Sequence, residues 1–105
     1  MTAISMDDVF EEAGLGGAVL LATVGGRCRK VEWSYELPTS GSLTASFSSG
    51  GSGVMVLFDV RGGWAKPRDS EPIGDGNVRD MTYGKAVGRI VLCVRKAYYA
   101  RRGRI

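Results

Sequence analysis

The sequence predicts a mainly β protein: a small antiparallel β-barrel or sandwich with a short N-terminal helix and a basic C-terminal tail. Four apolar or alternating runs follow one another with only short glycine- and serine-rich breaks, which is typical of an antiparallel β-meander. A further run, near residues 85–96, is rich in β-branched side chains and predicts a late strand. The 105 residues are expected to form a single domain. The four runs cover residues 18–24, 27–37, 42–47 and 54–61.

Before the first run, residues 6–13 are predicted to form a short helix. Ser5 is a suitable N-cap, two aspartates in the first turn complement the helix dipole, and Gly14 favours a stop. Val9 and Phe10 would give this helix an apolar side. Because so short a helix is marginal alone, we expect this apolar side to dock on the rest of the domain or on a partner.

The four runs differ in how they distribute apolar side chains. The second and third alternate, so each is predicted to have one buried and one wet face. The expected buried side chains are Val31, Trp33, Tyr35 and Leu37 in the second run and Leu43, Ala45 and Phe47 in the third. The first and fourth runs are apolar on both faces, which predicts cover on both sides by a sheet, a helix or another subunit.

The breaks between the runs predict turns and one long loop. Gly25-Gly26 suits a two-residue hairpin, and residues 48–53 predict a looser hairpin. Residues 62–80 are rich in Gly, Pro, Asp and Arg and lack periodicity, which predicts a long loop. Within it, Asp75 to Asn77 has the composition of a turn.

Residues 85–99 carry two conflicting patterns. The five residues Ile90 to Val94 have a strong β composition, whereas Val87, Ile90, Val91, Val94 and Tyr98 would also share one face of a helix. We favour a strand, since β-branched residues dominate and Gly84 and Gly88 weaken a helix. The remaining residues, 97–105, are expected to be a basic tail.

Residue types exclude several kinds of catalytic site and leave carboxylates, lysines and tyrosines as the possible catalytic groups. The chain has no histidine, which removes imidazole-based triads and the common histidine metal sites. Cys28 and Cys93 are too few for a structural zinc site, and we expect two free thiols rather than a disulfide. Four acids gather in the predicted loop. They could act as general acid and base or bind a cation, but we favour the interpretation that they are solvated residues of a polar loop. These acids are Asp69, Glu71, Asp75 and Asp80.

The glycine-rich segments 14–17 and 48–53 lack the strand-to-helix context of a phosphate loop and are interpreted as turns. We therefore assign no catalytic, cofactor-binding or metal-binding residue and predict that the protein is not an enzyme. The longest apolar stretch, residues 18–22, is too short to span a bilayer, and the acidic N-terminus is unlike a signal peptide. No membrane partner is expected.

Charge is distributed unevenly along the chain, whose net charge is +3. The first 26 residues hold four acids and no base, whereas the last 21 hold seven bases and no acid. Such a basic end favours an anionic partner, either nucleic acid or an acidic protein surface. Tyr and Arg are enriched at protein interfaces and also suit nucleic-acid binding, so both partners stay open. The candidate partner-binding residues are Arg95, Lys96, Tyr98, Tyr99, Arg101, Arg102, Arg104, Trp64, Val9 and Phe10.

The layout resembles the small head-tail joining and head completion proteins of tailed bacteriophages. The features that carry the resemblance are the helix at 6–13, the small β-barrel, the late polar loop containing Asp75 to Asn77 and a final strand at 88–96. The resemblance implies a virion protein that forms a ring with its neighbours and acts through protein interfaces. We thus expect a structural or assembly protein, homo-oligomeric, in the cytoplasm or the virion, with a nucleic-acid-binding module as the alternative.

Overall fold

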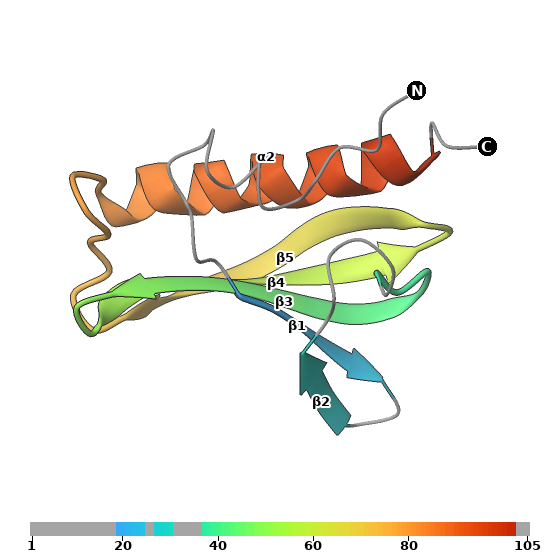
Figure 1. Cartoon of the computed structure of the whole chain (residues 1–105), viewed down its shortest axis with the longest axis horizontal. Helices are drawn as coiled ribbons and strands as arrows, with labels where there is room; N and C mark the ends of the chain where they lie inside the picture. The colour runs from blue at the N-terminus through green and yellow to red at the C-terminus, as the bar shows by residue number, and fades with distance from the viewer. Residues whose placement is uncertain (1–18, 25–26, 31–36, 103–105) are drawn as a thin grey trace.

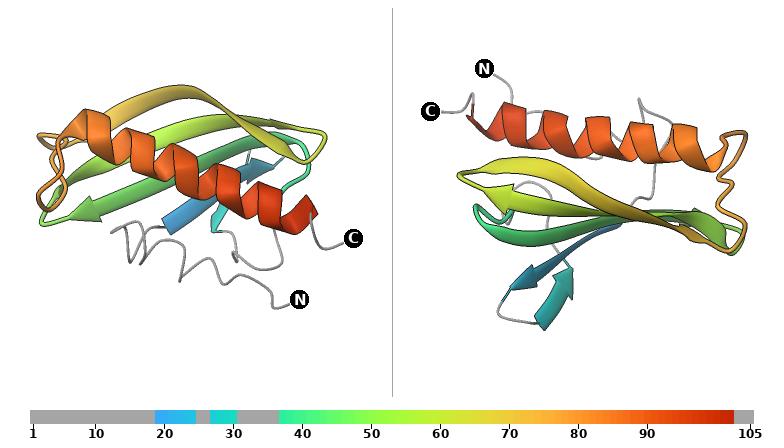
Figure 2. Two further views of the ribbon diagram at one scale, coloured as in Figure 1. Left: turned by 90° about the horizontal axis from the view of Figure 1, so that it is seen from above. Right: turned by 180° about the vertical axis from the view of Figure 1, so that it is seen from behind.

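The structure is a computed structural model of the chain and describes residues 19–24, 27–30 and 37–102. An antiparallel sheet of order β2-β1-β3-β4-β5 forms one layer, and a long helix lies across one of its faces (Figures 1 and 2). The predicted mainly β fold is confirmed, and the sheet is open rather than closed into a barrel. The elements are β1 (Val19–Val24), β2 (Arg27–Lys30), β3 (Gly41–Ser49), β4 (Ser52–Arg61), β5 (Trp64–Ile73) and α2 (Tyr83–Arg102).

The predicted late strand at 85–96 is wrong, because α2 occupies this region. Its buried side chains recur at helical spacing, at Ala86, Ile90, Val94 and Ala97, and pack against the sheet. One apolar face of the sheet needs cover, and burial of an amphipathic helix there outweighs the β preference of the branched side chains. Residues 97–102, expected to be part of a tail, are the last turns of this helix.

The predicted long loop at 62–80 is also wrong over most of its length, because it contains strand β5. A turn at Gly62 and Gly63, with φ of 60° and 73°, joins β4 to β5, which pair along their whole lengths. Since β5 is the edge strand, it tolerates Pro67 and Pro72, which a central strand would not. Most of its side chains are exposed, so it shows no apolar alternation in the sequence.

The hairpin between β3 and β4 is tighter than expected. Ser49 pairs with Ser52, so the turn consists of Gly50 and Gly51 alone. A Cβ at Gly53 would overlap the Phe47 carbonyl oxygen, so this position needs glycine.

The core lies between the sheet and α2. Leu43, Ala45 and Phe47 of β3 are buried in it, as the alternation predicted. Two tyrosine hydroxyls tie α2 to the sheet layer: that of Tyr98 donates to the Pro38 carbonyl, and that of Tyr83 shares a hydrogen bond with Ser70. The other core side chains are Leu20, Ala22, Leu37, Val54, Val56, Phe58, Val60, Ala65, Val78, Ala86, Ile90, Cys93, Val94 and Ala97.

Some predictions fall on residues outside those described. They include the helix at 6–13, the Gly25-Gly26 turn and the alternation of Val31, Trp33 and Tyr35. The pairing of Val24 with Arg27 does place β1 and β2 side by side as an antiparallel pair.

Candidate protein interfaces

The face of the sheet that points away from α2, here called the open sheet face, carries apolar side chains. In β4, Val56 and Phe58 are buried beneath α2, whereas Met55 and Leu57 point to the opposite side and are half-buried. In β1, Val19 is 39% exposed and Leu21 is half-buried. The sequence predicts cover on both faces of the first and fourth runs. Among the described residues, α2 covers one face of β4, whereas the open sheet face of β1 and β4 stays partly exposed, so its cover by a partner remains a prediction.

A hollow of about 160 Å³ lies on the open sheet face. Its apolar wall comes from β4 and its polar wall from β5, since Leu57 pairs with Asp69 and Met55 pairs with Glu71. Two carboxylates therefore stand beside two apolar side chains. The lining residues are Thr44, Met55, Leu57, Asp69, Ser70 and Glu71.

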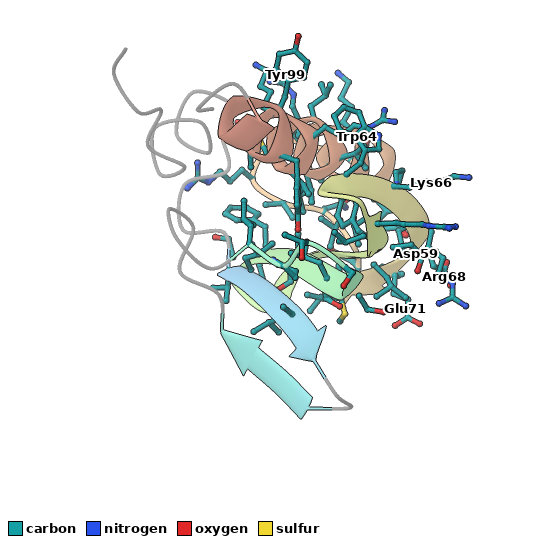
Figure 3. The ribbon with its side chains drawn as sticks, turned by 90° about the vertical axis from the view of Figure 1, so that its right-hand side faces the viewer. Asp59, Trp64, Lys66, Arg68, Glu71 and Tyr99 are labelled. Carbon is teal, nitrogen blue, oxygen red and sulfur yellow. The ribbon has the colours of Figure 1, made fainter. Side chains whose placement is uncertain are left out.

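The charges around the hollow are only partly balanced. Arg68 forms an ion pair of 3.6 Å with Asp59, but both side chains are more than half exposed, so the pair adds little stability. Asp69 accepts a hydrogen bond from the Ser70 backbone N–H. Within the described ranges, Asp69 and Glu71 form no ion pair. Figure 3 shows Asp59, Arg68 and Glu71 along this side of the molecule.

The second exposed surface is the side of α2 that faces away from the sheet, here called the outer helix face. Leu92 is 57% exposed and Tyr99 is 71% exposed, and Figure 3 shows Tyr99 pointing away from the sheet. No acidic residue occurs anywhere in α2. The face consists of Gly84, Lys85, Gly88, Arg89, Leu92, Arg95, Lys96 and Tyr99.

Two glycines on the outer helix face pack against nothing in the described part of the chain. A Cβ added at Gly84 or Gly88 would meet nothing within 4 Å. Glycine in a helix interior, as at Gly88, costs about 1 kcal/mol relative to alanine. Contacts within the described chain do not offset this cost, and the glycines leave a shallow strip of backbone open to approach from outside.

The candidate residues from the sequence are only partly brought together. Arg95, Lys96 and Tyr99 lie on the outer helix face, whereas Tyr98 is fully buried and packs in the core. Trp64 is 36% exposed at the start of β5. Arg101 and Arg102 lie in the last turn of α2, but the structure does not describe their side chains. Arg104, Val9 and Phe10 fall outside the described residues.

Sequence reasoning missed the exposure of Leu92 and the position of the two carboxylates of the hollow. Leu92 stands in an apolar run, and only the helical spacing of Gly88, Leu92 and Tyr99 could have placed it outside. The sequence places Asp69 and Glu71 in a predicted acidic loop. Their position beside Met55 depends on the β4–β5 register, which no sequence pattern signalled.

The four acids weighed for catalysis occupy different elements. Asp69 and Glu71 lie on β5, whereas Asp75 accepts a hydrogen bond from the Asn77 N–H, which confirms the predicted turn. This bond and one with the Ser52 side chain lower the pKa of Asp75. Asp80 lies just before α2. Among the described residues, no group of three or more acidic or cysteine side chains could hold a metal ion.

Cys93 is a free thiol in the core. Burial raises its pKa, which suits a structural role rather than a nucleophilic one.

No protein-family model, curated protein or solved structure matches the chain. In the part of the chain that the structure describes, no helix has both the length and the apolar character needed to cross a membrane.

Proposed function

We propose that the protein is a non-enzymatic structural or assembly protein that acts through protein–protein interfaces. The observation that carries the proposal is the open sheet face, where half-buried apolar side chains of β1 and β4 lie on the side that α2 leaves uncovered. Apolar side chains gathered in this way, with polar residues beside them, mark interaction surfaces. Leu92 and Tyr99 add exposed apolar area on the opposite side of the molecule.

The composition of both surfaces supports a protein partner. Interfaces are enriched in aromatic residues, Met and Arg, which are represented here by Tyr99, Met55 and Arg89. Apolar side chains next to charged ones allow a buried centre with a polar rim.

A place at the head-tail junction of a phage virion is a narrower form of this proposal. Its support is the resemblance in sequence layout. One part of that layout, the final strand at 88–96, is replaced by α2.

Nucleic-acid binding is a second candidate, favoured by one observation. The outer helix face presents Lys85, Arg89, Arg95 and Lys96 together with an exposed aromatic ring, Tyr99. Cations neutralise phosphates, and aromatic rings stack on bases. This candidate gives no role to the open sheet face.

Photo-crosslinking in the cells that naturally produce the protein tests the proposal. A photoreactive phenylalanine replaces Leu57 on the open sheet face or Leu92 on the outer helix face, and Ser49, exposed at the β3–β4 hairpin, is the control position. We expect nuclease-resistant crosslinks to protein from positions 57 and 92 and none from position 49. Crosslinks to nucleic acid alone would support the second candidate. The absence of crosslinks from both positions would overturn the proposal.

A further inference from the structure

We propose that the open sheet face of one copy binds the outer helix face of a second copy, so that the chains associate head to tail. A basic side chain of α2 would enter the hollow beside Asp69 and Glu71. This inference rests on the proposed function and names a partner, a second copy of the chain.

The two surfaces lie on opposite sides of one molecule. The helix packs across one face of the sheet, so its outer side and the open sheet face point in opposite directions (Figure 2). One copy can therefore use both surfaces at once, each with a different neighbour.

The charges of the two surfaces are complementary. The outer helix face carries Lys85, Arg89, Arg95 and Lys96, and α2 contains no acid. The hollow presents Asp69 and Glu71, which have no ion-pair partner in the described part of the chain. Pairing two outer helix faces would bring like charges together, whereas a helix placed over the hollow brings opposite charges together. The basic side chains of β5, Lys66 and Arg68, lie nearer the β4–β5 turn, where Arg68 pairs with Asp59.

The hollow also has the chemistry to hold a long basic side chain. The aliphatic part of a Lys or Arg side chain can lie along Met55 and Leu57 while its charged end reaches the carboxylates. Leu92, four residues before Lys96 and three after Arg89, would then contact the apolar part of the open sheet face.

The helix glycines fit the same contact. Gly84 and Gly88 leave backbone uncovered on the outer helix face, so a neighbouring sheet can approach the helix closely. Contacts among the described residues of one copy give no reason for these glycines, whereas close approach of a second copy does.

Such a contact joins different surfaces and is therefore heterologous. Heterologous contacts produce rings when the rotation between neighbours closes and filaments when it does not. A simple two-fold dimer is not expected from this contact.

Charge reversal tests the pairing. The first variant, Asp69→Lys with Glu71→Lys, makes the hollow basic. The second, Arg89→Glu with Lys96→Glu, makes the outer helix face acidic. A third variant combines all four changes, so both surfaces are reversed and complementary again. Asp80→Lys and Ser49→Glu, two exposed sites outside both surfaces, are the controls.

The measurement is molar mass by light scattering at low salt, with circular dichroism to confirm folding and the 260 to 280 nm absorbance ratio to detect nucleic acid. We expect the wild type and both controls to exceed twice the 11.2 kDa chain mass. Each of the first two variants should be monomeric, and the combined variant should regain the larger mass. Added salt should reduce the wild-type mass, since exposed charges are screened.

Several results would overturn head-to-tail pairing. They are a wild type that is monomeric or strictly dimeric, reversed variants of unchanged mass, or a folded combined variant that stays monomeric. Nucleic acid that is bound by the wild type and lost only with Arg89→Glu and Lys96→Glu would also overturn it. A monomeric wild type that still crosslinks to another protein from positions 57 or 92 would leave the proposed function intact.

Discussion

The hydroxyl of Tyr98 donates a hydrogen bond of 2.8 Å to the backbone carbonyl of Pro38, which joins the last turns of α2 to the segment that enters β3. The two residues are 60 positions apart in the sequence. Because Tyr98 is fully buried, loss of this bond would leave the Pro38 carbonyl without its donor beside the core, which costs free energy of folding. The contact therefore fixes where the C-terminal half of α2 lies on the sheet.

Removing this hydroxyl is expected to destabilise the protein. Tyr98→Phe should lower the free energy of unfolding by about 1–2 kcal/mol, since the ring still fills its site while the Pro38 carbonyl loses its donor. Denaturant unfolding measures the change. Tyr99→Phe is the matched control, because the neighbouring ring is 71% exposed, and it should leave the free energy unchanged. Equal effects of the two substitutions would contradict this role for Tyr98.

A small side chain on the outer helix face should separate stability from association. Gly88→Ala adds a Cβ that meets nothing within 4 Å among the described residues, so the isolated chain should gain up to about 1 kcal/mol. The same methyl group would obstruct close approach by a second copy. We expect a higher midpoint of denaturation together with a lower molar mass in solution. A stabilised variant that associates as well as the wild type would show that the contact does not need this glycine.

The opposite result is expected at Gly53. A Cβ there would overlap the Phe47 carbonyl oxygen, a backbone atom that cannot move without disturbing the β3–β4 pairing. Gly53→Ala should lower the free energy of unfolding by about 1–3 kcal/mol, as overpacking generally does. Gly50→Ala lies in the same hairpin, but its Cβ meets nothing within 4 Å, so its cost is limited to backbone strain at φ 64°. A greater loss for Gly50→Ala than for Gly53→Ala would contradict the steric explanation.

Cys93 should make stability fall at alkaline pH. Burial raises the pKa of its thiol in the folded chain, so the unfolded chain releases this proton at a lower pH than the folded chain. The neutral thiol therefore contributes fully to the free energy of unfolding at pH values below its pKa in the unfolded chain, about 8.5. This contribution is lost as the pH rises above that value. Unfolding experiments at pH 7 to 10 should show a shallower decline for Cys93→Ala than for the wild type. Parallel curves would indicate that other groups cause the decline.

The sequence predicted the strands that carry apolar or alternating runs and missed the elements whose position depends on distant neighbours. In β3, Leu43, Ala45 and Phe47 alternate with polar residues, and that alternation directly reflects burial beneath α2. Strand β5 has exposed side chains, so only its pairing with β4 makes it a strand. The β-branched residues of α2 are helical because the sheet provides an apolar face for them, which local preference does not reveal.

The candidate interfaces were likewise predictable only in part, because residue type can be read from the sequence but exposure cannot. Arg95, Lys96 and Tyr99 could be selected by residue type, since Tyr and Arg suit protein partners. Tyr98 has equally suitable chemistry but is buried, because the helix turns it toward the sheet. The hollow depends on the β4–β5 register that sets Asp69 opposite Leu57.

The prolines of β5 restrict the ways in which copies of this chain can meet. Pro67 and Pro72 lack the N–H groups that an incoming strand would require, so they protect this border of the sheet from extension by another chain. Proteins that are crowded with their own copies risk fusing sheets into fibrils through unprotected borders. With β5 blocked in this way, association on that side is directed to side-chain surfaces, whose contacts can be reversed and regulated by charge.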